Sequence, residues 1–436
     1  MSTTLNKLEY LDETKKEIKN ALNTNFNSGI TDEDTFRSYV GKINDIYTNW
    51  AKVTGTGTEI TLNNTKKGKM ALTPKGNTEQ NGTPTPDSPI DVRVVTGNNS
   101  VKVIGKNLFD TTITKTAGDG RIEDTTLETG KKLTWNGASA TTGYMWLGYV
   151  IKDITNYVGK IVRFKTNFSA SASNTPQYAI GICDSDGDNR TSKASSSTSG
   201  NTISFTIPSL SGTQTYLYVL LYANSGGTLN PNDYVDFTNM ILTIDNEDMT
   251  YIPYQSQTYP INLGTMELCK IDTYEDYIYK ENNKWYKHSE IGKVVLDGSE
   301  ENLSYNSTAN RLQMPFNLQT QDWGTLALTL CDHFTMGDTE IVDGSFNITR
   351  TILFFKNMNL TSLNDWKTWL GSNNTTVYYV LETSINTEIT DTTLISQLNA
   401  IENAVSYDTQ TNISSEYVES NAQMIISASA LEKGGN

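Results

Sequence analysis

The sequence contains few of the residues on which catalysis and nucleic-acid binding depend. Only two histidines occur among its 436 residues, and charged side chains make up 19%, against roughly 25% in an average soluble protein. The net charge is −15, and no basic stripe is present of the kind that neutralises nucleic-acid phosphates. The composition is therefore unusual for an enzyme of this size and argues against a nucleic-acid-binding protein.

Cysteines and long apolar runs are also scarce. Cys183, Cys269 and Cys331 lie far apart and form neither a CxxC pair nor a disulfide framework. Cys183 and Cys331 sit in apolar runs, so we expect buried free thiols there. No apolar stretch is long enough to cross a bilayer, and the first residues lack the basic and apolar leader of a secretory signal. We therefore expect a protein made in a cytoplasm, without membrane insertion.

The abundant residues favour β-structure. Threonine, serine and asparagine are common and 23 tyrosines occur, which suits pleated surfaces better than helices. Between residues 105 and 254, short strands alternate with Gly, Asn, Asp and Ser clusters, with no helix between them. This spacing predicts a sandwich, most simply a jelly roll. Beyond residue 257 further strands continue, interrupted by two short helices expected over 360–370 and 390–401.

The first fifty residues differ from the rest. Leu8, Leu11, Ile18 and Leu22 are spaced as in a coiled-coil seam, and a second amphipathic helix follows a capping box at 31–34. Two interpretations carry equal weight. The helices form a hairpin packed on the next domain, or they form a self-associating collar, which we expect to be trimeric.

These patterns predict a mainly β protein with a helical head and distinct domains. If residues 92–104 pair with 259–271 and 285–296, the jelly roll is an insertion into a β platform, which adjacent termini would allow. The proline-rich stretch 81–89 cannot join a ladder and should lie extended on a surface. The expected domains are a helical head (1–50), a β-rich linker or platform (51–104), a jelly roll (105–256) and a C-terminal β-rich domain with short helices (257–436).

Several segments resemble proteins of bacteriophage tails. YLDETKKEIK at 10–19 and TFRSYVGKI at 35–43 resemble the helical head of tail and baseplate proteins from phages of Gram-positive and related hosts. PTPDSP at 84–89, with VVTG at 94–97 and VKVIGKNLF at 101–109, resembles a module of phage minor structural and receptor-binding proteins. Further matching segments are NMILTI and YIPY at 239–254, WY at 285–286 and GKVVLDG at 292–298.

The resemblance implies a fold and a place in the virion. In that family the module opens a carbohydrate-binding-module-like jelly roll. The chain is then expected to be a tail fibre or receptor-binding protein, assembled in the host cytoplasm as a homotrimer. Other tail or baseplate proteins, and host cell-wall or capsular polysaccharide, would be its partners. Because such jelly rolls serve as spacers as often as binders, a purely structural virion protein remains the alternative.

We expect no enzymatic activity. His288 and His333 are the two possible bases for a nucleophilic triad, and neither lies in a recognisable motif. Cys331 and His333 are too close on one strand to be more than a weak suggestion of a cysteine–histidine pair. A glycosidase needs only two carboxylates, which stays formally open. However, tail enzymes that degrade polysaccharide generally use long parallel β-helices, and no solenoid repeat is present.

An aspartate-rich segment could hold calcium. Asp184, Asp186 and Asp188 stand at alternate positions and supply the hard oxygen ligands that calcium prefers. The glycine is misplaced for an EF-hand, and no bidentate glutamate follows at the expected place. A simple Asp/Gly hairpin turn is therefore the favoured interpretation. We expect no other cofactor.

Aromatic residues are the candidates for glycan binding. Sugars stack their apolar faces on tryptophan and tyrosine rings, and one segment contains a cluster of four such residues, Trp135, Tyr144, Trp146 and Tyr149. Tyr216, Tyr218 and Tyr222 share one face of another strand, because side chains alternate with period two. That set is either half of a core, which we favour, or half of a binding platform. Trp135, Trp146 and Tyr149 are the predicted glycan-binding residues.

Overall fold

The computed structural model describes residues 52–171, 174–315, 328–337, 341–349, 351–417 and 422–431. Strands dominate this part of the chain, which confirms the prediction of a mainly β protein. Its α-helices are α4 (Leu363–Ser372) and α5 (Thr392–Glu402), close to the two short helices expected from the sequence. The predicted helical head, with Leu8, Leu11, Ile18 and Leu22, lies outside the described residues.

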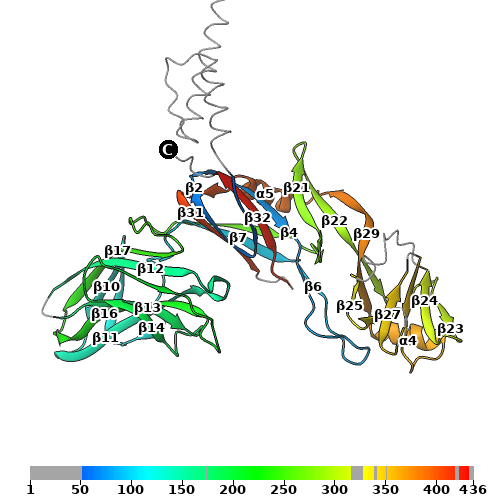
Figure 1. Cartoon of the computed structure of the whole chain (residues 1–436), viewed down its shortest axis with the longest axis horizontal. Coiled ribbons are helices and arrows are strands. Elements are labelled where there is room, and N and C mark those ends of the chain that lie inside the picture. Colours follow the sequence, from blue (N-terminus) through cyan, green and yellow to red (C-terminus); the bar gives the residue numbers. More distant parts are fainter. Residues whose placement is uncertain are drawn as a thin grey trace, which may run out of the picture.

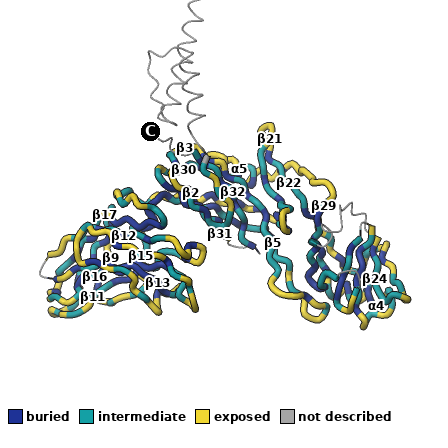
Figure 2. The backbone as a smooth tube through the Cα atoms, in the orientation of Figure 1, coloured by how far each residue is buried: buried dark blue, intermediate teal, exposed yellow. Residues whose placement is uncertain are grey.

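The described part of the chain folds into three bodies with separate cores (Figure 1). We call them the sandwich (described residues of 105–255), the third body (described residues of 297–372, without Leu330–Cys331, which belong to a platform sheet) and the platform (the remaining described residues). Figure 2 shows the buried backbone concentrated inside each body. The long strands β22 (Lys284–Leu296) and β29 (Thr375–Glu388) run from the platform towards the third body and pair with each other.

The sandwich consists of two five-stranded antiparallel sheets, with strand orders β15-β12-β17-β10-β9 and β14-β13-β16-β11-β8. Large apolar side chains from both sheets, including Phe164, Tyr178 and Phe237, fill the space between them. Its strands are β8 (Ala117–Gly118), β9 (Ile122–Leu127), β10 (Gly130–Trp135), β11 (Thr141–Asp153), β12 (Ile161–Ala170), β13 (Gln177–Cys183), β14 (Thr191–Ser196), β15 (Thr202–Thr206), β16 (Tyr216–Leu229) and β17 (Tyr234–Ile244).

The strand pairs of the sandwich are nested. β10 pairs with β17, β11 with β16, β12 with β15 and β13 with β14, all antiparallel. This is the pattern of one long hairpin folded over on itself. Two further pairs, β12 with β17 and β13 with β16, join the folded halves into sheets.

The platform is built from two further sheets and carries helix α5 against its core. One sheet has the order β1-β32-β4-β21-β22-β29-β25 and the other β18-β7-β31-β2. The strands not yet given are β1 (Lys52–Gly57), β2 (Glu59–Thr65), β4 (Ala71–Lys75), β7 (Asn98–Ile104), β18 (Ser256–Asn262), β21 (Tyr277–Glu281), β25 (Leu330–Cys331), β31 (Thr409–Tyr417) and β32 (Ile425–Leu431). The short pairs are β3 (Gly68–Lys69) with β30 (Val405–Ser406), β5 (Thr78–Glu79) with β6 (Arg93–Val94), and β19 (Lys270–Ile271) with β20 (Tyr274–Glu275).

The sandwich leaves and rejoins the platform through neighbouring strands. Ile104, the last residue of β7, lies opposite Ser256, the first residue of β18. The pairing expected between 92–104 and 259–271 is therefore present in these two strands. The pairing expected with 285–296 is not, because β22 pairs with β21 and β29 instead.

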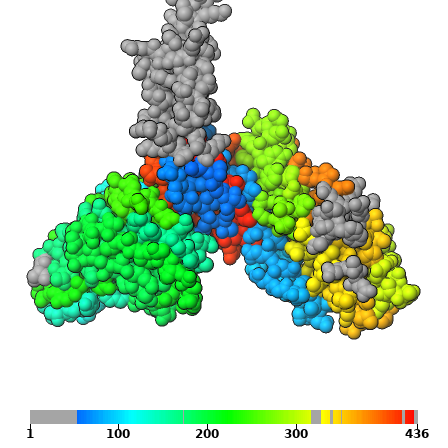
Figure 3. Space-filling model, viewed as in Figure 1, coloured from blue at the N-terminus to red at the C-terminus, as the bar shows by residue number. Residues whose placement is uncertain are grey.

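The third body contains a small sheet of order β23-β24-β28-β27-β26, covered by α4 through Trp366 and Leu370. The proline-rich segment reaches it from the platform (Figure 3). The carbonyl of Pro84 accepts a hydrogen bond from the Thr335 hydroxyl (2.9 Å), and Ile90 N donates to Asp332 O (2.8 Å). The strands are β23 (Ser304–Asn306), β24 (Arg311–Pro315), β26 (Thr335–Met336), β27 (Ser345–Ile348) and β28 (Ile352–Phe355).

Candidate functional site: an aromatic face on the sandwich

Aromatic side chains gather on one outer surface of the sandwich. Leu217, Val219 and Leu221 of β16 point into the core, so the alternate positions point outward. We call the outward set the aromatic face. It comprises Tyr144 and Trp146 of β11 and Tyr216, Tyr218, Leu220 and Tyr222 of β16. The aromatic face belongs to the sheet β14-β13-β16-β11-β8, which in Figure 1 lies on the side of the sandwich away from the platform.

The aromatic face has a buried floor and exposed rings. Tyr218 and Leu220 are only 2% and 5% exposed, whereas Tyr144 is 68% exposed. Trp146 and Tyr222 are half-buried and lie directly opposite each other on neighbouring strands. The Tyr144 ring meets the Tyr222 ring edge-on, with centroids 6.2 Å apart. One end of the face therefore offers three adjacent accessible rings.

Small residues on the flanking strands leave these rings room. Gly148 and Ala179 lie on either side of Leu220, and Gly181 lies beside Tyr218. A Cβ atom at Gly148 would stand 3.4 Å from the Trp146 ring, so the indole leans over this glycine. Larger side chains at these positions would fill the space beside the rings.

Arg190 supplies a cationic group to the aromatic face. Its guanidinium carbon lies 4.5 Å from the centre of the Trp146 ring, within the range of a cation–π contact. Arg190 also donates a hydrogen bond to the carbonyl of Gly187, in the turn that precedes β14. The turn thus positions hydrogen-bond donors next to the indole.

Burial opposes ionisation of two tyrosines and a thiol at the aromatic face. Burial raises the pKa of Tyr218 to about 12 and also raises the pKa of Tyr222. Burial likewise raises the pKa of the Cys183 thiol to about 12. A buried, protonated thiol is a poor nucleophile. The chemistry available here is ring stacking and hydrogen bonding.

The structure corrects two of the three predicted glycan-binding residues. Trp135 and Tyr149 are 1% and 0% exposed and belong to the sandwich core, so their rings cannot stack on a ligand from solvent. Trp146 alone lies on the aromatic face. Tyr144 belonged to the aromatic cluster seen in the sequence but was not among the predicted binding residues, and Arg190 was missed. Tyr216, Tyr218 and Tyr222 lie on the side of β16 away from the main core, where Tyr218 and Leu220 are buried in a small apolar cluster of their own. The favoured core interpretation therefore holds for Tyr218, whereas Tyr216 and Tyr222 are half-buried.

The three aspartates form a turn. Asp184 Oδ1 accepts a hydrogen bond from Asp188 N (2.7 Å), and Asp184 Oδ2 accepts one from the Asn189 side chain (3.0 Å). Asp186 and Asp188 are exposed. Asp184, Asp186 and Asp188 thus form the hairpin turn that the sequence favoured, and no group of three or more potential metal ligands occurs among the described residues.

The two histidines hold structural contacts. His333 Nδ1 lies 2.7 Å from Asp332 Oδ1, an oxygen that also accepts a hydrogen bond from Thr376 N (2.9 Å). Cys331 is buried, and burial raises the pKa of its thiol. His288 stacks on Tyr277 with ring centres 4.5 Å apart. Both histidines thus contact neighbouring side chains of their own chain.

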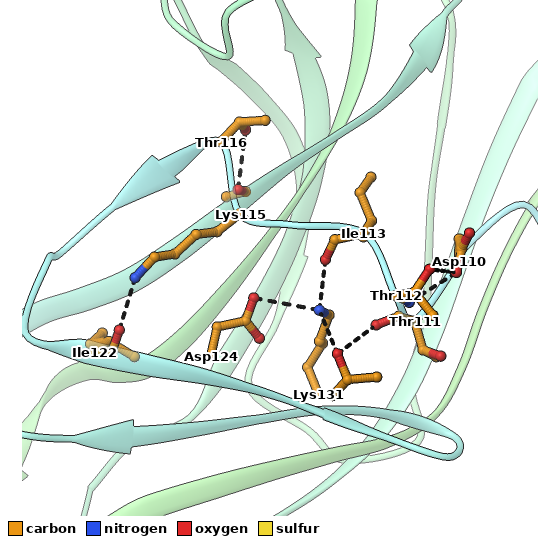
Figure 4. A network of polar contacts seen from close by, with 11 residues as sticks. Asp110, Thr111, Thr112, Ile113, Lys115, Thr116, Ile122, Asp124 and Lys131 are labelled. Carbon is orange, nitrogen blue, oxygen red and sulfur yellow. Dashed lines mark hydrogen bonds and ion pairs between the residues drawn. The ribbon is translucent and has the colours of Figure 1, made fainter.

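A buried lysine fixes the loop that enters the sandwich (Figure 4). Lys131 of β10 is 2% exposed, and its Nζ donates to the carbonyl of Ile113 (2.7 Å). Asp124 Oδ2 and Thr126 Oγ1 both lie 3.4 Å from the same nitrogen. Lys115 Nζ donates to Ile122 O (2.9 Å) and ties the same loop to β9. This network is internal and stabilises the body that carries the aromatic face.

Comparison with known proteins adds little. No protein-family model matches the chain, and no curated protein matches it. Among solved structures, one match is to a mutant of Xylanase10C from Cellvibrio japonicus in complex with xylopentaose. That match has 13% identity and a TM-score of 0.18, and it covers 34% of this chain and 27% of that chain. At this TM-score the match carries no argument about fold or function. No helix in the described part of the chain is long and apolar enough to cross a membrane.

Proposed function

We propose that this chain is a non-enzymatic component of a bacteriophage tail or baseplate, a tail fibre or receptor-binding protein that contacts host cell-surface glycan. The observation that carries the glycan contact is the aromatic face, with Tyr144, Trp146 and Tyr222 accessible at one end. The virion location rests on the resemblance of segments such as 84–89 and 101–109 to phage structural proteins.

The sandwich suits this role as a jelly roll similar to carbohydrate-binding modules. Its nested strand pairs, from β10 with β17 inward to β13 with β14, follow the two-sheet order of that fold. The fold alone assigns no ligand, because one fold hosts many functions. The proposal therefore depends on the side chains of the aromatic face.

The chemistry of the aromatic face fits a sugar. The apolar face of a pyranose ring can stack on Trp146 and Tyr222, and burial of that area drives association. Sugar hydroxyls then need hydrogen-bond partners, and the Arg190 guanidinium beside the indole donates several. Bacterial cell-wall or capsular polysaccharide is the proposed partner.

The remaining parts would place the sandwich on the particle. We propose that residues 1–50 form the attachment and oligomerisation head, through which the chain assembles as a homotrimer and binds other tail or baseplate proteins. The platform and third body would act as the rigid support. The protein would be assembled in the host cytoplasm and be carried in the virion.

The alternative is a purely structural virion protein. Tyr218 and Leu220 are already almost fully buried, and Arg190 lies over Trp146, so part of the aromatic face is covered within the chain. In this alternative a neighbouring subunit covers the rest. The face would then be an assembly contact without affinity for glycan.

A direct test uses a panel of immobilised cell-wall and capsular polysaccharides and the full-length chain. The test variant is Trp146→Ala with Tyr222→Ala, and the control is Tyr417→Ala, which removes an exposed ring of the platform (55% exposed). We expect binding to at least one polysaccharide that falls at least tenfold in the double variant, a loss of about 1.4 kcal/mol. The control should bind normally. Absence of binding by the intact oligomer would favour the structural alternative.

A further inference from the structure

A cavity lies where the sandwich meets the platform, separate from the aromatic face. Its volume is about 440 Å³, within the range of small-molecule sites, and such sites often form between domains. The platform contributes residues of β2, β7 and β31, and the sandwich contributes residues of β11 and its entry loop. The sandwich and the platform therefore share one potential site.

The platform side of this cavity carries a polar row across three strands. Glu59 of β2 lies directly opposite Ser414 of β31, and Ser414 lies directly opposite Lys102 of β7. The adjacent residues Ile60 and Ile413 are buried in the platform core, so the row faces the other way. With strands about 4.8 Å apart, a carboxylate, a hydroxyl and an ammonium span about 10 Å.

The sandwich side completes the polar lining. Lys152 Nζ donates to the Tyr157 hydroxyl (2.8 Å) and lies 3.7 Å from Glu59 Oε1. The other carboxylate oxygen, Glu59 Oε2, is buried and has no hydrogen-bond partner within the described part of the chain. Lys102 has no ion pair there either. Glu59 Oε2, an acceptor, and Lys102 Nζ, a donor, thus lie at opposite ends of the row and are available to a ligand.

The mixed charges of the lining restrict the ligand. The remaining carboxylates of the lining are Asp110, Asp153 and Glu416. A cation would meet two lysines, and an anion would meet four carboxylates. An apolar ligand would leave the buried Glu59 oxygen without a partner, which costs about 1–3 kcal/mol or more. A neutral ligand with several hydroxyls satisfies both kinds of group, because a hydroxyl donates to carboxylates and accepts from ammoniums.

The apolar part of the lining fits the same chemistry. Ile104, Leu108, Ile113 and Ile151 provide aliphatic wall, and Tyr254 adds a half-buried ring. A sugar has both hydroxyl edges and C–H faces, which matches a polar row beside an aliphatic wall. We propose that this cavity binds a neutral, polyhydroxylated ligand of the size of a sugar unit, held by Glu59, Ser414 and Lys102.

The test uses the full-length chain and probes that differ in charge. Glucose, galactose and N-acetylglucosamine are the neutral sugars, with glucosamine as a cationic and glucuronate as an anionic relative. Binding is followed by ligand-observed NMR and calorimetry. We expect at least one neutral sugar to bind more tightly than both charged relatives. Glu59→Gln and Lys102→Met should each weaken that binding at least fivefold.

Two controls separate this site from the aromatic face and from misfolding. Trp146→Ala should leave sugar binding at the cavity unchanged. The test of the cavity therefore gives a result whether or not the aromatic face binds glycan. Lys102→Met removes no ion pair of the described chain, so it should retain the native circular dichroism spectrum and melting temperature. The proposal is overturned if no neutral sugar binds, if a charged relative binds best, or if binding follows Trp146 instead of Glu59 and Lys102.

Discussion

The buried lysine of the sandwich gives a sharp prediction about stability. In Lys131→Met the side chain keeps similar apolar bulk but loses its ammonium, which is 2% exposed in the native protein. The Ile113 carbonyl loses its 2.7 Å donor, and the 12%-exposed Asp124 carboxylate loses its cation. Removing one partner of a buried ion pair costs about 3–5 kcal/mol. Because the Lys131–Asp124 distance is 3.4 Å, we expect about 3 kcal/mol.

The double variant tests the cause of that loss. In Lys131→Met with Asp124→Asn the unpaired buried charge is gone, so we expect at least about 1 kcal/mol of stability to return. For a body of about 150 residues, 3 kcal/mol corresponds to a fall in melting temperature of about 6–12 °C. Differential scanning calorimetry of the full chain should show this fall in one transition, assigned to the sandwich by hydrogen exchange. A single variant as stable as the native chain, or a double variant no better than the single, would refute the reasoning.

Three further predictions follow from local geometry. Gly181→Ala should destabilise the sandwich by about 2 kcal/mol or more, because the alanine Cβ would stand 2.2 Å from the Thr191 carbonyl oxygen. The calorimetric transition of the sandwich should move to lower temperature, and an unchanged transition would contradict this prediction. The Lys106 side chain lowers the pKa of Asp248 from 3.8 to about 2. The stabilisation that the Asp248 carboxylate contributes is therefore complete above pH 3.8 and is lost as pH falls through 2. Asp248→Asn should flatten the acid-unfolding curve in that window. The Cys183 thiol, with its pKa raised by burial, should react with a thiol reagent only after denaturation, and rapid reaction in the native chain would count against the fold.

Local patterns in the sequence were enough to predict the elements. The helix expected over 390–401 forms as α5, because the Asp391 side chain accepts hydrogen bonds from Thr393 N (2.8 Å) and Leu394 N (2.9 Å). The strand periodicity at 216–222 correctly placed Tyr216, Tyr218 and Tyr222 on one face. These features depend on neighbours within a few residues, which a single sequence displays.

The side of each strand that faces the core could not be read from the same patterns. Trp135 and Tyr149 have the composition of a sugar site, yet they pack inside, while Trp146 lies outside. Which face is covered depends on a second sheet supplied by distant residues. The prediction for Tyr216 and its neighbours held only in part for the same reason, since both faces of β16 carry apolar side chains and only Tyr218 of the three tyrosines is fully buried.

The polar row of the cavity was beyond sequence reasoning altogether. Glu59 and Ser414 are far apart along the chain and meet only because β2 pairs with β31 in a particular register. A shift of one residue would turn Glu59 into the core and expose Ile60. The aspartates at 184–188 show the limit of a spacing pattern. Their spacing suggested calcium, but the backbone turn uses their oxygens for its own hydrogen bonds.

Inhibition of phage adsorption tests the central claim most directly. In this test of the proposed function, purified full-length chain is added to bacterial cells before a phage whose genome encodes the chain, and free phage is counted. We predict that the native chain and Tyr417→Ala block adsorption in a dose-dependent way, whereas Trp146→Ala with Tyr222→Ala blocks at least tenfold less. Adsorption that is unaffected by saturating native chain, or blocked equally by the double variant, would contradict a role for the aromatic face in binding the host.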